Sequence, residues 1–145
     1  MRVRNLLHRK TSEVVTVGES DAVSHAVRVL LDRGVGGLAV VDEYGALTGF
    51  LSERDVVDAL NRHSGDVRNL QVAHVMRRPP VCGMEDDVTV VMQRMTSERL
   101  RHLVAVDQGR PVGVISVGDI VKQRLVELEM ETGVLRDYVA GQRAV

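Results

Sequence analysis

The chain has 145 residues, of which 44% are hydrophobic but only 2% aromatic, and its 19 basic and 20 acidic side chains give a formal net charge of −1. This balance argues against non-specific nucleic-acid binding, which needs a strong basic field and, on single strands, aromatic rings for the bases. No apolar stretch approaches the length of a membrane span, and the single cysteine excludes an internal disulfide, so a cytoplasmic setting is expected.

The first half of the chain predicts a strand, a helix, a β-hairpin and a second helix. Apolar side chains recur at helical spacing in the first helix, which Gly34 is suited to end. Short apolar runs on either side of Tyr44-Gly45 are typical of hairpin strands. In chain order, these elements are predicted at residues 14–17, 22–33, 38–41, 47–51 and 52–61.

The second half repeats this order after a linker at residues 63–69. Its last helix is expected to end at Gly133, before one more short helical piece at residues 135–139. An apolar stripe on that helix, made of Val121, Leu125 and Leu128, indicates either packing within the chain or a dimer contact. In chain order, the repeated elements are predicted at residues 81–82, 88–98, 103–106, 112–115 and 116–132.

A repeated heptapeptide marks the duplication most clearly. Gly-Phe-Leu-Ser-Glu-Arg-Asp at residues 49–55 is matched by Gly-Val-Ile-Ser-Val-Gly-Asp at residues 113–119, about half a chain length further on. We therefore predict an α/β (α+β) fold of two pseudo-symmetric repeats packed sheet to sheet. Their bounds are predicted at residues 1–64 and 65–130, followed by a helical tail at residues 131–145.

The Ser-x-x-Asp part of the heptapeptide has two explanations. Ser52 and Ser116 precede predicted helices, and Asp55 and Asp119 stand where the acidic residue of a capping box would reach back to the serine. The start of a helix also attracts phosphate, and a carboxylate one turn further is suited to accept hydrogen bonds from a ribose diol. The local sequence is consistent with helix caps alone or with a nucleotide site.

The frame around the two motifs resembles a known family. Gly-Leu-Ala-Val-Val-Asp at residues 37–42 precedes the first motif, and Arg-His-Leu-Val-Ala-Val-Asp at residues 101–107 precedes the second. Over about residues 1–130 the chain resembles a tandem CBS-domain pair, or Bateman module, the unit named after cystathionine β-synthase. The tail is similar to that of small stand-alone bacterial proteins of this family.

The resemblance implies that an adenosine-type ligand (AMP, ADP, ATP, NAD or S-adenosylmethionine) binds in the cleft between the repeats. The motif aspartates would hold ribose hydroxyls, the motif serines would contact ribose or phosphate, and the motif glycines would allow close approach of the backbone. Basic residues would neutralise phosphate, and the first strand of each repeat would contact adenine. The implied ligand-binding residues are Thr16, Val17, Gly49, Ser52, Arg54, Asp55, Val81, Cys82, Arg101, His102, Gly113, Ser116 and Asp119.

The two sites are expected to differ. Arg101 and His102 enter the second hairpin, whereas Gly36 and Gly37 stand at the same place in the first repeat. The sequence therefore predicts that the motif at residues 113–119 forms the occupied nucleotide site, and that the motif at residues 49–55 forms a weaker site or only a cap.

The predicted function is a regulatory module that senses an adenosine nucleotide and signals through an effector protein or a dimer rearrangement. A homodimer is expected, with no nucleic-acid or membrane partner and no required cofactor. The alternative is a ligand-free CBS interaction module whose Ser-x-x-Asp motifs serve only as caps. An enzyme is disfavoured because the five histidines lack metal-ligand spacing and no constellation for covalent catalysis is present.

Overall fold

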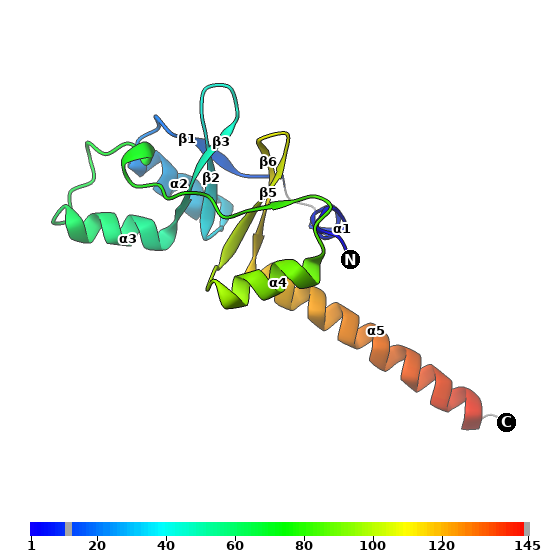
Figure 1. Cartoon of the computed structure of the whole chain (residues 1–145). Helices are drawn as coiled ribbons and strands as arrows, with labels where there is room; N and C mark the ends of the chain where they lie inside the picture. Colours follow the sequence, from blue (N-terminus) through cyan, green and yellow to red (C-terminus); the bar gives the residue numbers. More distant parts are fainter. Residues whose placement is uncertain (11–12, 144–145) are drawn as a thin grey trace.

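The computed structural model describes residues 1–10 and 13–143. Two similar series of elements follow one another along the chain (Figure 1). The first series is α1 (Val3–Arg9), β1 (Thr16–Gly18), α2 (Val23–Arg33), β2 (Gly37–Val41), β3 (Leu47–Ser52) and α3 (Glu53–Arg62). The second series is the 3₁₀ helix η1 (Val72–His74), β4 (Val81–Gly83), α4 (Val88–Ser97), β5 (His102–Asp107), β6 (Arg110–Ser116) and α5 (Val117–Arg143).

Each repeat contains a three-stranded sheet with the same connections. In the first, β1 runs parallel to β2 and β3 antiparallel to it, and β4, β5 and β6 repeat this arrangement. A parallel pair needs a crossover, which α2 and α4 provide, whereas the antiparallel pair needs only a tight turn. Both hairpins carry an irregularity after the same strand position, at Val40 and at Ala105. The duplication in the sequence is therefore a duplication of topology.

The two sheets face one another, as predicted. Ala39, Phe50 and Val104 form a buried cluster between them. Neighbouring strand residues point the other way, with Leu38 and Val40 in the core of the first repeat, because side chains alternate across a strand. This alternation explains why the central strands read as continuous apolar runs.

The short helix that precedes each first strand packs on the opposite repeat. Val3 and Leu6 of α1 are buried in the core of the second repeat, and Val72 of η1 is buried in the core of the first. Backbone hydrogen bonds secure both, from the Val3 N–H to the Asp86 carbonyl at 2.9 Å and from the Val72 N–H to the Asp21 carbonyl at 2.8 Å. The packing thus crosses the repeat bounds drawn from the sequence.

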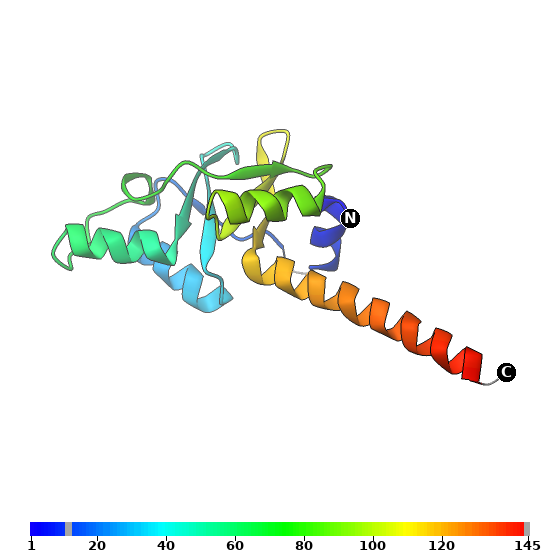
Figure 2. The same ribbon diagram turned by 60° about the horizontal axis from the view of Figure 1, so that its bottom comes forward.

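The C-terminal helix differs from its prediction in two respects. Helix α5 continues through Gly133 to Arg143, so the expected break there is wrong. It projects away from the rest of the chain in both views (Figures 1 and 2). Val121, Leu125 and Leu128 are each about half exposed, so packing within the chain is not the reason for their stripe. No helix in the described ranges is long and apolar enough to cross a membrane.

Candidate functional site

Both Ser-x-x-Asp motifs form complete capping boxes. The Ser52 Oγ accepts from the Asp55 N–H at 3.3 Å, and the Asp55 carboxylate accepts from the Ser52 N–H at 2.8 Å. The same two bonds join Ser116 and Asp119, at 3.1 and 2.8 Å. These bonds satisfy N–H groups that a helix start leaves without partners. The structural explanation of the motif is therefore confirmed for both copies, and any ligand role is additional to it.

The two aspartates differ in their remaining partners. Asp55 is 8% exposed, and its Oδ1 accepts from Nε and Nη2 of Arg77 at 2.9 and 2.5 Å, while its Oδ2 accepts from the backbone and hydroxyl of Ser52. The Asp119 side chain is 22% exposed, and both its serine bond and its ion pair with Lys10, at 2.8 Å, use Oδ2. Among the described residues, Oδ1 of Asp119 accepts no hydrogen bond.

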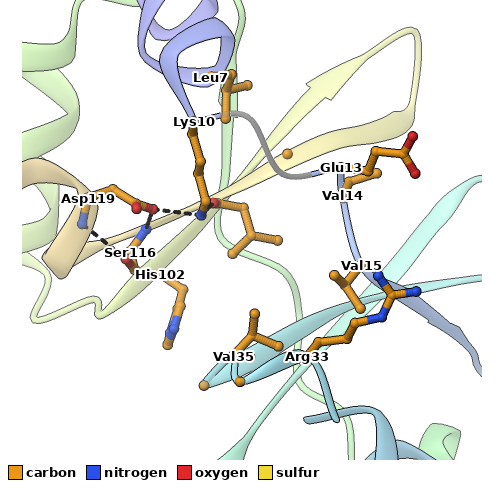
Figure 3. Close-up of a pocket in the computed structure, with 15 residues that line it drawn as sticks. Leu7, Lys10, Glu13, Val14, Val15, Arg33, Val35, His102, Ser116 and Asp119 are labelled. Atoms are coloured by element: carbon orange, nitrogen blue, oxygen red, sulfur yellow. Dashed lines mark hydrogen bonds and ion pairs between the residues drawn. The ribbon is translucent and has the colours of Figure 1, made fainter. Parts of the chain in front are cut away.

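Asp119 and Ser116 line a cavity of about 540 Å³, which we call the Asp119 cavity. Its opposite wall comes from the first repeat, with Val15, Arg33 and Val35 lying across the cavity from the two motif residues in Figure 3. The Lys10 side chain enters from beyond α1 and also donates to the Val114 carbonyl at 2.7 Å. The cavity is therefore composite, built from the motif of one repeat and the segments around the first two strands of the other.

A second cavity of about 590 Å³ has the reciprocal construction, and we call it the arginine cavity. Ser52 and Arg54 of the first motif lie on one side, and Pro80 and the segment 99–102 of the second repeat complete it. His102 lines both cavities, and its ring lies 5.3 Å from that of Phe50, between centroids. The two cavities thus occupy equivalent places in the pseudo-symmetric fold, although Asp55, unlike Asp119, does not line its cavity.

This exchange overturns one expectation. Arg101 lines the arginine cavity with the first motif, not the cavity with Ser116 and Asp119. The physical reason is that the sheets face one another, so the loop before β5 lies against the motif of the opposite repeat. Of the two residues that the sequence associated with the second motif, Arg101 therefore lies with the first motif, and His102 lines both cavities.

The strand residues that were expected to contact adenine lie outside both motif cavities. Val17 and Cys82 are buried in the cores of their repeats, and neither Thr16 nor Val81 lines either motif cavity. The residues just upstream line them instead: Val14 and Val15 in the Asp119 cavity and Pro80 in the arginine cavity. Sequence periodicity located the strands but not the extended residues before them.

The motif glycines serve packing. A Cβ at Gly113 would lie 2.5 Å from Cδ2 of Leu7, and a Cβ at Gly49 would lie 2.9 Å from Cγ of Met76. These contacts come from α1 and from the segment after η1, so the space beside each strand is filled by the chain. Gly113 also lines the Asp119 cavity, while Gly49 lines neither motif cavity.

Several cavity residues were missed from the sequence, chiefly Lys10, Arg33, Arg77 and Arg99. Lys10 and Arg77 share a signal, since both follow the segments that the repeat aligns before each first strand. Each forms an ion pair with one motif aspartate. The aspartate and its cation thus recur together in the two repeats.

The Asp119 cavity is electrostatically balanced. Burial alone would raise the pKa of Asp119, but hydrogen bonds from Lys10 and Ser116 together with the Lys10 charge lower it, so the carboxylate is ionised at neutral pH. Burial, and next the Lys10 charge, lower the pKa of His102, so its ring is neutral there. Across the described residues, no group of acidic, histidine and cysteine side chains could hold a metal ion.

Comparison with known proteins places the chain in a family. The CBS domain model matches residues 3–62 and 72–125. An inosine-5′-monophosphate dehydrogenase from Methanocaldococcus jannaschii is 32% identical over 114 residues, which cover 77% of this chain and 22% of that enzyme.

Solved structures agree with this match. A CBS-domain containing protein from Agrobacterium tumefaciens has a TM-score of 0.78 and 33% identity, covering 86% of this chain and 99% of that one. A CBS domain protein from Pyrobaculum aerophilum, solved in complex with AMP, has a TM-score of 0.78 and 24% identity, covering 91% of this chain and 99% of that one. With its two matched segments and its two composite cavities, the chain belongs to the CBS-domain family as a tandem pair of CBS domains.

Proposed function

We propose that the chain is a regulatory module that binds an adenosine nucleotide in the Asp119 cavity. The observation that carries this proposal is the Asp119 carboxylate, which is ionised, lies on the wall of a cavity of about 540 Å³ and keeps Oδ1 without a hydrogen bond among the described residues. The volume lies within the range of small-molecule sites. Support also comes from the protein of the same fold that was solved with AMP.

In the proposed complex the ribose hydroxyls donate to Oδ1 of Asp119. The base lies against the apolar wall of Val14, Val15 and Val35, where backbone groups of the extended segment before β1 are available to its polar edge. Two cations supply positive charge for a phosphate: Lys10 on the same wall as Asp119, and Arg33 on the opposite wall. Each role follows from where the side chain lies around the cavity.

The competing function is a ligand-free interaction module. The complete capping boxes favour it, because they give both Ser-x-x-Asp motifs a structural purpose without any ligand. The two functions differ in what Asp119 does beyond capping, so a substitution that keeps the side-chain shape and an acceptor oxygen separates them. Asp119→Asn is such a change, since it removes the carboxylate charge and one of the two acceptors.

The test is a thermal-shift and calorimetric panel with adenosine, AMP, ADP, ATP, NAD and S-adenosylmethionine. A ligand at about 100 times its Kd stabilises a protein by about 2.7 kcal/mol, which for this chain length raises the Tm by several degrees. Asp119→Asn should weaken binding about tenfold or more, because a hydrogen bond to a charged group is worth about 1.5–3 kcal/mol.

Asp58→Asn is the matched control, since Asp58 is an exposed aspartate on α3 whose ion-pair partner is Arg62. It should leave ligand binding unchanged. If no member of the panel raises the Tm, or if Asp119→Asn binds as the wild type does, the ligand-free interaction module becomes the better description.

A regulatory module has to transmit ligand binding to a surface that another molecule contacts. We propose a homodimer that joins through α5, supported by the exposed stripe of Val121, Leu125 and Leu128 on a helix that projects from the body. An apolar stripe at helical spacing is the pattern that packs against a second helix. Leu125→Glu should convert the dimer to a monomer in sedimentation velocity, and an unchanged sedimentation coefficient would remove α5 from the interface.

A further inference from the structure

We propose that α5 of one chain forms a parallel, in-register, two-stranded coiled coil with α5 of a second copy. This inference rests on the homodimer of the proposed function and adds the direction and the register of its two helices. Helix α5 runs from Val117 through Gly133 to Arg143 without a break. One continuous helix therefore carries both the exposed apolar stripe and the residues that follow Gly133.

The stripe on this helix follows a seven-residue repeat. The intervals between its positions alternate between four and three residues, which is the spacing of the d and a positions of a coiled coil. Beginning with d, these positions are Val121, Leu125, Leu128, Thr132, Leu135 and Val139. The first three side chains are each about half exposed, and α5 projects from the body of the chain (Figure 2). The body therefore leaves this face open to a second helix.

The residue types at these positions favour two strands. In parallel coiled coils, a β-branched residue at a together with leucine at d favours a dimer. From Leu128 onward both d positions are leucine, and both a positions are β-branched, one threonine and one valine. The hydroxyl of Thr132 donates to the Leu128 carbonyl at 2.9 Å, so this side chain enters an apolar seam with its donor already paired.

An antiparallel pair would leave part of the stripe uncovered. In the antiparallel register that brings the two central leucines together, Leu125 lies opposite the partner's Leu128. Leu135 then lies opposite the partner's Gly118, which has no side chain to cover it, and Val139 lies beyond the start of the partner's helix. Parallel pairing instead covers all of the stripe positions over about 27 Å, because a helix rises about 1.5 Å per residue.

Charged residues beside the stripe fit the parallel register. There the g residue of one helix meets the e residue of the next heptad on the other helix, and Arg124 stands at g and Glu129 at e. Glu131 and Arg136 repeat this relation with the charges exchanged. Glu129 forms no ion pair within the described part of the chain. Arg124 donates to Glu127 through Nη1 alone, at 2.9 Å, which leaves other N–H groups of its guanidinium for a carboxylate of the second copy.

This arrangement connects the dimer to the Asp119 cavity. Asp119 lies in the first turn of α5, and the first d position, Val121, follows two residues later. Parallel helices therefore place the two Asp119 cavities at the same end of the dimer, beside the point where the helices meet. An antiparallel pair would place them at opposite ends.

The first test exchanges charges in the whole chain and measures the Kd of the dimer by sedimentation velocity. Glu129→Arg should raise this Kd about fivefold or more, because each exposed ion pair contributes a factor of a few and two are lost per dimer. The double variant Arg124→Glu/Glu129→Arg should recover most of the loss. In an antiparallel dimer Glu129 would instead face the partner's Lys122, and the double variant would oppose two cations there. A Kd that stays raised or rises further in the double variant therefore overturns the inference.

Glu43→Arg is the matched control for this charge reversal. Glu43 is exposed in the turn of the first hairpin, away from α5, and forms no ion pair among the described residues. The Kd of the dimer should be unchanged by this substitution. A rise in Kd equal to that of Glu129→Arg would assign the effect to net charge and count against the coiled coil.

The second test measures the register by disulfide formation. Leu128→Cys should form a covalent dimer under mild oxidation, because in-register helices bring the two introduced sulfurs together. Met130→Cys, on the same helix but outside the stripe and 63% exposed, should remain a single chain on a non-reducing gel. The wild-type chain controls for the native Cys82, which is buried. A mixture of Leu125→Cys and Leu128→Cys chains that cross-links to each other in preference to themselves would show antiparallel helices and overturn the inference.

Failure of the parallel coiled coil is distinguishable from failure of the proposed function. A monomeric wild type, or a dimer that survives Leu125→Glu, removes the α5 dimer itself and the coiled coil with it. A dimer that Leu125→Glu dissociates, but that cross-links only between positions 125 and 128, keeps the proposed dimer and overturns its parallel direction. Binding of AMP that Asp119→Asn weakens supports the nucleotide site in each of these cases.

Discussion

The two motif aspartates should contribute unequally to stability although their sequence motifs look alike. We expect Asp55→Ala to destabilise the fold more than Asp119→Ala does. Each change removes one half of a capping box, which is worth about 0.5–2 kcal/mol by analogy with N-cap residues. The difference arises from the other partners of each carboxylate and from its burial.

For Asp55 the additional loss is the paired contact with Arg77 at 2.9 and 2.5 Å, made by an aspartate that is only 8% exposed. Hydrogen bonds to charged groups contribute about 1.5–3 kcal/mol, but the Arg77 side chain is 55% exposed and regains water. After that discount, the total for Asp55→Ala is about 2–4 kcal/mol.

For Asp119 the additional loss is the Lys10 ion pair, whose two side chains are 32% and 22% exposed. Such a pair adds about 0.5–1 kcal/mol, so the total for Asp119→Ala is about 1–3 kcal/mol. Urea titrations at pH 7 in the absence of ligand measure both. The transition midpoint should fall further for Asp55→Ala, with a slope like that of the wild type.

The pH of this measurement matters because the pKa of Asp119 is lowered from its ordinary value of 3.8. A group whose pKa is lower in the folded state contributes stability above the unfolded value and loses it as pH falls through the folded value. At pH 7 the contribution is complete.

Asp58→Ala controls for loss of a surface aspartate and should change stability by less than about 0.5 kcal/mol. Equal losses for Asp55→Ala and Asp119→Ala, or a larger loss for the latter, would refute the reasoning.

Three other experiments test the burial and the packing of residues in the two repeats. The pKa of His102 is lowered from 6.5 by burial and by the charge of Lys10, so the imidazole binds a proton more readily in the unfolded chain than in the folded one. The free energy of unfolding should therefore fall as the pH drops below 6.5. The variant His102→Gln should reduce that fall, as measured by urea titrations at several pH values. Gly37→Ala would place a Cβ 2.9 Å from Cε1 of Phe50 and should cost about 1–3 kcal/mol. The double variant with Phe50→Leu should recover part of this loss, and full additivity in thermal unfolding would contradict the steric cause. Burial raises the pKa of Cys82 to about 11, so iodoacetamide should label it only after unfolding, as mass spectrometry would show, and rapid labelling of the native chain would contradict its burial.

Local patterns in the sequence predicted the elements of both repeats closely. The strand at residues 38–41 is β2 at Gly37–Val41, and the helix at residues 22–33 is α2 at Val23–Arg33. Helical spacing and short apolar runs are properties of neighbouring residues, so they are visible without the fold. The exceptions are α1 and η1, for which no element was predicted, and Gly133, where local propensity indicated a break but α5 continues. Helix propensity is a weak signal against the bonds of an established long helix.

The candidate site was predicted in part. The motif residues lie where helices begin, because a capping box depends on residues a few positions apart, which a heptapeptide can specify. These residues are Ser52, Asp55, Ser116 and Asp119. What the heptapeptide does not specify is which cation each aspartate meets. Lys10 is more than a hundred positions from Asp119 in the chain, and their contact exists only because α1 crosses to the second repeat.

By itself, the sequence determined the duplication, the order of elements and the two capped helix starts, because each depends on residues close together in the chain. Only the tertiary structure decided how the halves meet. By setting the sheets face to face, it placed Arg101 with the first motif and Gly37 with the second, the reverse of the assignment by proximity in sequence. The unequal cavities therefore come from the exchange of segments between repeats, which no local pattern of residues contains.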